Sequence, residues 1–348
     1  MNKYSRAILP TPDSAVTNGQ CNFGTFDSAI VNLNLLDAKK PLGLSLPTGI
    51  QGFRLKEWEA IQIACKDWFF CVSVYNTKTI GTAIIMAYDR NKGRMYVYQH
   101  KVPCWKLKVP SGLANSHCYY HSPNFKIDIN NQLDSKRVTI SFSAKKFKHQ
   151  PNLEASFTGH YQTQPIVIIQ PFGDNRPLYS HKSLMSSEGT LNVDSHIYNY
   201  TSQDTCMIMD DHKGYYPYIM KYDWATAMGF NDRGELQGFN LTDNQVTDHE
   251  KYNENCLWLG GTMHPLPPIK IQRPEGVTGT WHIRDDYHMV RLSFTPLADV
   301  PNYLNLGFAE TRYHGPTGEF KGFIMSPDKQ QIDFDGFIGM GEKKYIRM

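Results

Sequence analysis

Alternation of apolar and polar residues with a period of two recurs along this chain, and it constrains the fold more than any other feature of the sequence. The pattern is clear at residues 125–130 and 138–143, which a short polar loop separates, and it returns at 290–295. Successive side chains of a strand point to opposite faces, so this period predicts strands with one dry face and one wet face. Such strands are typical of antiparallel sheets.

Denser apolar runs at residues 68–75 and 80–88, joined by a turn at 76–79, predict strands that are buried on both faces. Residues 55–66 fit either a helix or a strand, and their alternation favours a strand. Few other segments have helical spacing. Many short antiparallel strands predict an all-β fold built from barrels or sandwiches.

The chain has 348 residues, which is more than one hydrophobic core usually supports, so two modules are expected. A proline-rich passage at residues 165–177 is followed by a polar stretch at 180–189, and this is the expected boundary. The predicted modules are residues 1–185 and 186–348. A second proline cluster at 265–274 predicts a long connection between two strands.

Charge and cysteine content exclude several kinds of partner. The chain has 36 Lys and Arg against 33 Asp and Glu, a net charge of +3, so it lacks the strong positive field that favours binding to nucleic acids and anionic lipids. No stretch is apolar for the length of a membrane span, and no secretory signal precedes Pro10. The seven cysteines include no CxxC pair, which argues against a disulfide framework and a zinc knuckle. We therefore expect reduced thiols in a cytoplasmic protein with neither a nucleic-acid partner nor stable membrane insertion; the oligomeric state stays open.

Several catalytic motifs are absent from the sequence. It contains no GxxxxGK(S/T), GxSxG or HExxH, and no GxGxxG between a strand and a helix, so the usual geometries of phosphate-loop, serine-hydrolase, zincin and Rossmann chemistry are missing. Acid–base chemistry without a cofactor, an unrecognised metal site and plain ligand binding remain. We expect the protein to act without a cofactor.

The densest polar and aromatic cluster lies at residues 209–217. Two carboxylates, Asp210 and Asp211, precede His212 and Lys213, and enclosing such groups pushes their pKa values apart. In an extended segment Asp210 and His212 share one face while Asp211 and Lys213 share the other, so one of the two pairs is expected to point inward. The plainer alternative is a solvated turn.

A second cluster lies at residues 281–288 and carries side chains that can bind a metal, namely His282, Asp285 and His288. The alternative is a hairpin turn with residues 284–286 at its tip. Weaker candidates for carboxylates near a barrel mouth are the pairs Glu310 with His314 and Gly341 with Glu342.

Four segments carry a resemblance to a known family: Leu55–Glu59, Tyr88–Asp89, Asp210–Pro217 with Trp224, and Gly339–Glu342. Together they resemble a bacterial family called Domain of Unknown Function 2804 over nearly the whole chain. The stretch from Gly189 to Trp224 is similar, more distantly, to the lipocalin-like carotenoid hydratases and tocopherol cyclases. In those relatives an acidic residue stands four positions before a glycine, and a proline and a tryptophan-rich strand follow.

The resemblance assigns roles to particular residues. Asp210 matches the acidic position, although Lys213 stands where the relatives usually carry a tryptophan. The resemblance therefore implies that Asp210 is a catalytic acid. The complete set of expected site residues is Asp210, Asp211 and His212 for catalysis, Lys213, Tyr215 and Trp224 for ligand binding, and Gly214 and Pro217 for the turn.

The resemblance also implies two lipocalin-like β modules in tandem, with a mostly apolar cavity in or between them. The related enzymes protonate an alkene or guide a cyclisation without a metal or redox cofactor. The leading hypothesis is a hydratase, isomerase or cyclase acting on a lipophilic small molecule, with burial raising the pKa of Asp210 so that it donates a proton. The alternative is a non-catalytic carrier of a hydrophobic ligand. A metal-dependent or carbohydrate-active enzyme is the third hypothesis.

Overall fold

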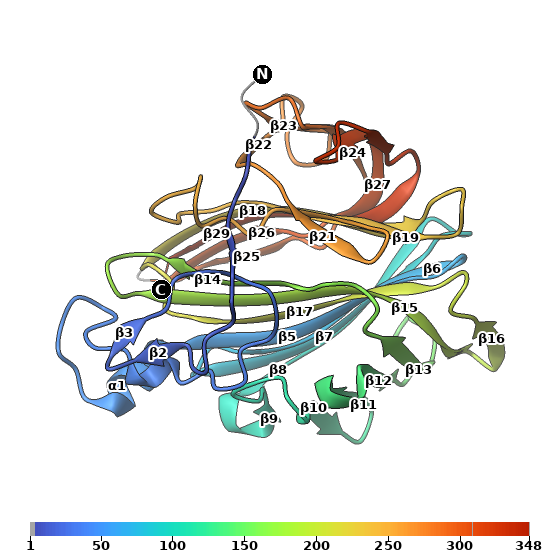
Figure 1. Ribbon diagram of the computed structural model, residues 1–348. Coiled ribbons are helices and arrows are strands. Elements are labelled where there is room, and N and C mark those ends of the chain that lie inside the picture. The colour runs from blue at the N-terminus through green and yellow to red at the C-terminus, as the bar shows by residue number, and fades with distance from the viewer. Residues whose placement is uncertain (1–3, 308, 348) are drawn as a thin grey trace.

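The computed structural model describes residues 4–307 and 309–347, and nearly all of its regular structure is strand (Figure 1). One α-helix, α1 (Thr48–Arg54), occurs in the described part, together with short 3-10 turns such as η1 (Leu35–Asp37). The prediction of an all-β fold with two antiparallel modules is confirmed.

The larger sheet has fifteen strands and curls into a nearly closed barrel, which we call the N-terminal barrel. The strands predicted near residues 55–66, 68–75, 80–88, 125–130 and 138–143 all belong to it. In spatial order its main path is β8 (Arg94–Pro103), β7 (Ile80–Asp89), β6 (Trp68–Asn76), β5 (Lys56–Ala64), β17 (Cys206–Gly214), β15 (Pro177–Val193), β13 (Leu153–His160), β12 (Arg137–Ala144), β11 (Phe125–Gln132), β10 (Ser116–Ser122) and β9 (Leu107–Lys108). The strands off this path are β1 (Ile8–Leu9), β4 (Gly24–Phe26), β14 (Ile166–Pro171) and β16 (His196–Tyr200).

The second sheet has twelve strands and forms a half-barrel, which we call the C-terminal half-barrel. Its main path is β21 (Thr262–Pro265), β20 (Cys256–Leu259), β19 (Leu236–Asp243), β18 (Ile219–Phe230), β29 (Phe337–Arg347), β27 (Thr317–Met325), β24 (Val290–Ala298), β23 (Trp281–Asp285) and β22 (Ile269–Gln272). Off this path are β25 (Asn302–Asn305), β26 (Glu310–His314) and β28 (Gln331–Asp333). A separate small hairpin pairs β2 (Val16–Thr17) with β3 (Gln20–Cys21).

The chain passes from one sheet to the other between Gly214 and Ile219. The expected boundary between 185 and 186 lies inside β15, a strand of seventeen residues. The prolines that suggested a boundary, Pro171 and Pro177, close the turn between β14 and β15 instead. The polar stretch after them forms part of β15, and its residues 180–187 are buried.

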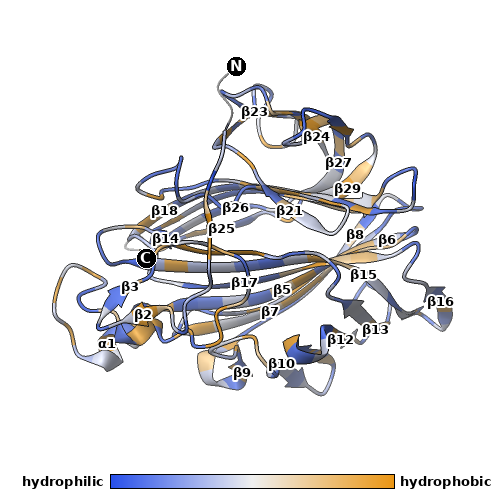
Figure 2. Ribbon diagram, in the orientation of Figure 1, coloured by the Kyte–Doolittle hydropathy of each residue, from blue (hydrophilic) through white to orange (hydrophobic). Residues whose placement is uncertain are grey.

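The half-barrel packs against the outer face of the barrel wall. In Figure 1, β18 lies above β14, β15 and β17, and Figure 2 shows hydrophobic stretches on strands of both modules. One buried apolar cluster contains residues of both sheets, including Leu184, Ile208, Trp224, Trp258 and Met340. Strand β17 therefore has the barrel core on one face and the half-barrel on the other.

The N-terminal segment connects the two modules. Arg6 is buried against the half-barrel, where its guanidinium group donates hydrogen bonds to the Asn253 side chain and to the Asn255 carbonyl. A few residues later, β1 and β4 pair with each other and β4 joins the barrel through β14. Figure 1 shows this segment running from the half-barrel down to the barrel.

The seven cysteines are free thiols, as predicted. In the part of the chain that the structure describes, no helix has the length and apolar character needed to cross a membrane.

Candidate functional site

Strand β17 presents two pairs of ionisable residues to opposite sides of the barrel wall. Asp210 and His212 face the half-barrel, while Asp211 and Lys213 share the inward face with Met209 of the barrel core. Their exposed fractions are 7%, 1%, 0% and 2%, respectively. As expected for an extended segment, one pair alone points into the barrel, but the other pair is also buried, because β17 is covered on both faces and all nine of its residues are buried.

The pair that faces the half-barrel belongs to a group that we call the inter-module cluster: Ser180, Lys182, Asp210, His212 and Glu254. Strand β15 lies beside β17 in a register that places Lys182 opposite Asp210 and Ser180 opposite His212. The Lys182 Nζ atom donates to Asp210 Oδ1 at 2.7 Å and contacts His212 Nε2 at 3.0 Å. Residues separated by about thirty positions are thus joined by strand pairing.

Glu254 comes from the half-barrel, just before β20, and completes the cluster. The Ser180 hydroxyl donates to Glu254 Oε2 at 2.6 Å, and Lys182 Nζ lies 3.8 Å from the same oxygen. Tyr222 and Thr242 donate their hydroxyl protons to Glu254 Oε1. Since Ser180 and Lys182 belong to the barrel, the site forms only where the two modules meet.

Charge pairing sets the protonation of the cluster. Burial alone would raise the pKa of Asp210, but Lys182 and His212 outweigh it and hold that pKa well below its usual range. The pKa of Glu254 is lowered in the same way, against the effect of burial. Burial would lower the pKa of Lys182, yet the two carboxylates raise it. The expectation that burial keeps Asp210 protonated is therefore wrong, because the ammonium group of Lys182 lies beside its carboxylate.

His212 contacts the cluster through one of its two ring nitrogens, Nε2. Because an ammonium group can only donate, the contact from Lys182 places the proton of the neutral imidazole on Nδ1. The Nδ1 atom is buried and has no hydrogen-bond partner among the described residues. The atoms around Nε2 are Ser180 Oγ at 3.0 Å, Lys182 Nζ at 3.0 Å, Asp210 Oδ1 at 3.1 Å and Glu254 Oε2 at 3.5 Å.

Aromatic rings form the wall beside His212. The Trp58 ring stacks on His212 with centroids 4.6 Å apart and on Tyr216 at 5.5 Å. The Tyr216 hydroxyl is buried, and no described residue bonds to it. Lys344 lies over the Trp58 ring at 5.4 Å and is 15% exposed at its side chain. Trp58 is also half-buried, so this wall is the side of the cluster nearest to solvent.

Trp224 lies at the other side of the cluster. Its indole nitrogen donates to Asn240 Oδ1 at 2.6 Å, and Lys182 Nζ is 5.2 Å from its ring centroid. Asp210 and Trp224 thus both lie near the Lys182 ammonium group.

Three other residues of the 209–217 segment lie outside the inter-module cluster and contribute to the packing and the chain path. Tyr215 is fully buried in an apolar cluster with Leu35 and other residues of the N-terminal segment, away from the inter-module cluster. Gly214 lets β15 approach closely, since a Cβ there would lie 2.8 Å from Leu178 Cα. Pro217 is half-buried in the link between the two sheets.

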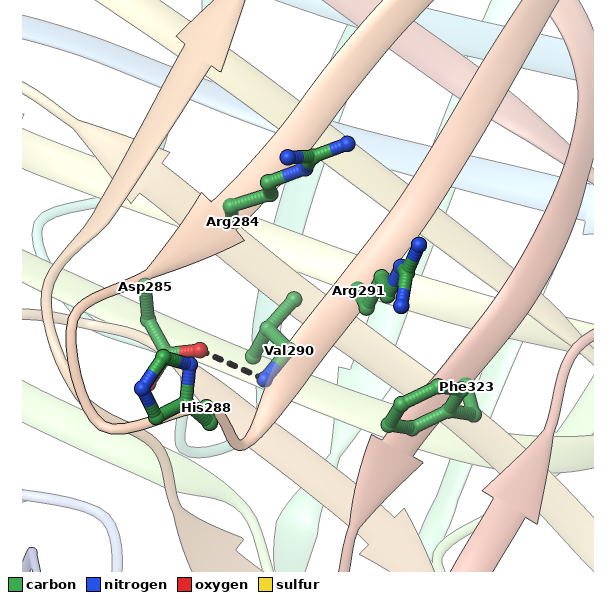
Figure 3. Close-up of a pocket in the computed structure, with 6 residues that line it drawn as sticks. All are labelled: Arg284, Asp285, His288, Val290, Arg291 and Phe323. Carbon is green, nitrogen blue, oxygen red and sulfur yellow. Dashed lines mark hydrogen bonds between the residues drawn. The ribbon is translucent and has the colours of Figure 1, made fainter.

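The cluster at residues 281–288 forms a hairpin turn. The Asp285 carboxylate accepts backbone N–H bonds from Tyr287, Met289 and Val290, the last at 2.6 Å. Asp285 and His288 are among the residues that line a surface hollow of about 300 Å³, and Figure 3 shows these side chains with the hydrogen bond between Asp285 and the Val290 backbone. The carboxylate that would bind a metal therefore stabilises the turn, and within residues 4–307 and 309–347 no group of His, Cys, Asp or Glu has the geometry of a metal site.

The weaker candidates lie elsewhere in the half-barrel. Glu310 pairs with Arg312 at 2.7 Å, and His314 Nδ1 lies 2.6 Å from Asp299. Glu342 accepts a hydrogen bond from Tyr313 at 2.7 Å and stands opposite Trp224 in the β18–β29 register. Glu342 is thus the member of this group nearest to the inter-module cluster.

Sequence reasoning missed five side chains of the site: Trp58, Ser180, Lys182, Tyr216 and Glu254. Trp58 occurs in a segment that carried the family resemblance, but it had no assigned role. The charged Lys182 lies between apolar pairs at 178–179 and 184–185, which is a signal for a buried charge in a strand. Nothing local to Glu254 signals its position.

Comparisons with known proteins give a family and a fold. A family model described as Domain of unknown function (DUF2804) matches residues 11–348. No curated protein matches the sequence. Kievitone hydratase from Nectria haematococca has a similar structure, with a TM-score of 0.51 and 9% identity over 84% of this chain and 88% of that chain. A protein from Nitrosomonas europaea, provisionally assigned as an AttH, matches with a TM-score of 0.48 and 12% identity over 86% of this chain and 96% of that chain.

Proposed function

The chain belongs to the DUF2804 family of unknown function, and we propose that it is a cofactor-independent enzyme that performs acid–base chemistry on a lipophilic small molecule at the inter-module cluster. The observation that carries the proposal is the buried His212, which is held through Nε2 by three charged groups and offers Nδ1 beside the aromatic wall of Trp58 and Tyr216. Buried imidazoles with one fixed and one free nitrogen are suited to general acid–base catalysis.

His212 is the proton donor in this proposal, in place of Asp210. When the imidazole is protonated, Nε2–H points at Asp210 Oδ1, 3.1 Å away, the Lys182 ammonium group donates to Asp210 instead of to Nε2, and Nδ1–H is the proton given to the substrate. The ionised Asp210 and Glu254 balance the charges of Lys182 and the imidazolium. Asp210 and Lys182 therefore act as positioning residues that orient and tune His212.

The reaction that suits this arrangement is the addition of water to an alkene. Transfer of the Nδ1 proton to one alkene carbon leaves a cation on the other. The rings of Trp58 and Tyr216 stabilise that charge. A water molecule then attacks the cation and returns one proton to the imidazole. Loss of a neighbouring proton from the cation, without water, gives isomerisation at the same site.

Hydration is the first reaction to test because the fold is shared with kievitone hydratase. Purified protein is incubated with kievitone and with a panel of other lipophilic alkenes in water enriched in oxygen-18, and the products are analysed by mass spectrometry. We expect a product that has gained one water and carries one labelled oxygen. His212→Gln should abolish it, whereas His160→Gln, on the outer face of β13, should retain it.

Two outcomes would count against the proposal. Products that form equally with His212→Gln would exclude His212 as the acid. Tight binding of alkenes with no turnover across the panel would favour the carrier, which needs a cavity alone.

A further inference from the structure

The interior of the N-terminal barrel is polar at one end. Inward-facing positions of β5, β17 and β15 carry apolar residues in one half, including Ile61, Met207 and Met185. The same faces continue with polar residues, which we call the polar end: Glu57, Glu59, Tyr179, His181, Asp211 and Lys213. This group lies on the opposite face of β17 from the inter-module cluster.

Glu59 is the central residue of the polar end. Strand register aligns His181, Asp211 and Glu59 in one row across β15, β17 and β5. Glu59 is 0% exposed, and neither of its carboxylate oxygens has a hydrogen-bond partner in the described chain. Asp211 bonds to Lys213 through Oδ1, while its Oδ2 atom is also buried without a bond from any described residue.

Asn131 and Tyr161 add further buried polar atoms from other parts of the barrel wall. Asn131 is 0% exposed and follows Phe125, Ile127 and Ile129 on the inward face of β11. The Asn131 amide group and the Tyr161 hydroxyl are within reach of each other, and neither has another hydrogen-bond partner among the described residues. Burial has the largest effect on the pKa of Tyr161 and raises it. Asn131, Glu59 and Asp211 also change this pKa, so these side chains are neighbours of Tyr161.

The unpartnered atoms specify the kind of ligand. Buried polar atoms without partners are rare in folded proteins. Here the unpartnered oxygens of Glu59, Asp211 and Asn131 have few donors near them, namely the Asn131 amide, the Tyr161 hydroxyl and the single proton of a neutral Glu59. Lys213 supplies one positive charge for two carboxyl groups, and His181 adds none, because burial and Lys213 lower its pKa to about 3. The missing partner is therefore a hydrogen-bond donor that carries positive charge.

The same end of the barrel has an apolar rim. The Lys56 ammonium group, at the start of β5, donates to the carbonyls of Phe53 and Thr77, so α1 lies beside the β6–β7 turn. The backbone N–H of Cys104 donates to the Thr79 carbonyl of that turn. Large apolar side chains are exposed around it: Ile50 at 51%, Phe53 at 49%, Ile80 at 52% and Trp105 at 77%. This rim offers an entry for an apolar molecule, and Figure 1 shows α1 and β9 at this lower side of the barrel.

We propose that the N-terminal barrel binds a small amphiphile with a protonated amine, whose ammonium group lies among Glu59, Asp211 and Asn131 and whose apolar body extends along Met185, Met207 and Met209. Methionine side chains are flexible and can repack around such a body. The ammonium group supplies the donors and the charge that the unpartnered oxygens lack.

Octylamine is the probe, with octanol and octanoate as matched compounds that share its chain. We expect octylamine to bind in isothermal titration calorimetry at pH 7 and to raise the melting temperature. Octanoate should bind at least about tenfold more weakly, since the cation of the polar end, Lys213, is already paired with Asp211. Octanol, which lacks the charge, should also bind more weakly.

Two variants, and the number of protons released on binding, test the position of the amine. Glu59→Gln removes one charge with little change of shape and should weaken octylamine binding at least about tenfold. Glu154→Gln, exposed on β13, should change it less than about twofold. Binding to the wild type below pH 7 should release a proton from Glu59, seen by comparing buffers of different ionisation enthalpy. The titratable groups that face Glu59 are Glu57, Cys118, Tyr161, Tyr179, His181, Asp211 and Lys213.

Several results would overturn the proposal. Equal binding of octylamine and octanol would show that charge is not recognised. Equal binding to wild type and Glu59→Gln, or no proton release, would place the amine elsewhere. If neither octylamine nor octanol binds, the polar atoms are partnered by water and the barrel has no amphiphile site.

Discussion

The ammonium group of Lys182 contacts two carboxylates, those of Asp210 and Glu254, and 1% of the Lys182 side chain is exposed. Taking three charges out of water is costly, and the cost is offset only while each has its partners. The arrangement fixes the protonation of all three groups and places His212 beside them. Residues that hold a neighbouring buried side chain in this way are expected to be sensitive to substitution.

Removing the cation should destabilise the protein strongly. Lys182→Met leaves two carboxylates buried side by side, and loss of one partner from a buried ion pair costs about 3–5 kcal/mol. Lys270→Met is the matched control, because Lys270 pairs with Asp243 at the surface with 70% of its side chain exposed, and such pairs contribute about 0–1 kcal/mol. Urea denaturation at pH 7 measures both. Equal losses in the two variants would contradict the description of the cluster.

Glu59 should make stability fall as the pH rises. Burial, then Asp211, raises its pKa to about 8, while in the unfolded chain a glutamate ionises near pH 4.3. Between about pH 4.3 and 8 the folded state therefore holds a proton that the unfolded state has lost, and stability decreases over this range. The carboxyls with lowered pKa, Asp210 and Glu254, act in the opposite sense, but below about pH 4.

Glu59→Gln should flatten this dependence. At pH 8 we expect the variant to exceed the wild type in stability by about 1–3 kcal/mol, since a buried acceptor without a partner is costly. At pH 5 the difference should be smaller. Urea denaturation at the two pH values gives the comparison, with Glu154→Gln as control. A wild type that is more stable at pH 8 than at pH 5, with the same trend in Glu59→Gln, would contradict the assigned protonation.

Strand pairing, rather than any local motif, assembles the site. The alternation of residues predicted β11, β12 and β24, because one face of each is apolar and the other polar. It gave no sign that both faces of β17 are covered, because that depends on the half-barrel, which the chain forms later. For the same reason the sequence could not show on which face of the sheet Lys182 lies, because that face is covered partly by Glu254, more than seventy residues away.

Gly214 permits the close pairing of β15 with β17 that brings Lys182 to Asp210. A Cβ at this position would lie 2.6 Å from Leu178 Cδ1 and 2.9 Å from the Pro177 carbonyl oxygen. Gly214→Ala should therefore destabilise the protein by about 1–3 kcal/mol through overpacking.

Gly49→Ala is the matched control for this substitution. Gly49 is a residue of α1 with no described atom within 4 Å of an added Cβ, so the change should leave stability unaltered or raise it slightly. Urea denaturation compares the two variants. A Gly214→Ala protein as stable as Gly49→Ala would contradict the close approach of β15 and β17.

The two modules share one core and one polar site, so they should unfold together. The cluster that includes Leu184 and Ile208 of the barrel and Trp224 and Trp258 of the half-barrel is continuous across the interface, and Arg6 ties the N-terminal segment to the half-barrel. Far-ultraviolet circular dichroism and tryptophan fluorescence should give coincident denaturation curves. Two separated transitions would contradict a shared core.

The sequence predicts two β modules, but the structure divides the chain between them at a different point. Length and alternation are enough for that architecture, since both follow from how much surface a chain can bury. The division differs because prolines at residues 171 and 177 mark a turn within the barrel. The density of polar and aromatic residues led to the segment that contains Asp210 and His212, and the family resemblance assigned a role to Asp210; the partner side chains depend on the packing of the whole molecule.

In the proposed reaction, His212 gives its proton to the substrate at the interface between the two modules. The measurement is the turnover of an alkene substrate by His212→Gln, made together with the affinity of the variant for that substrate. We expect turnover to fall at least about 100-fold, as for loss of a general acid, while the dissociation constant changes less than about tenfold. Unchanged turnover in this variant would contradict the account.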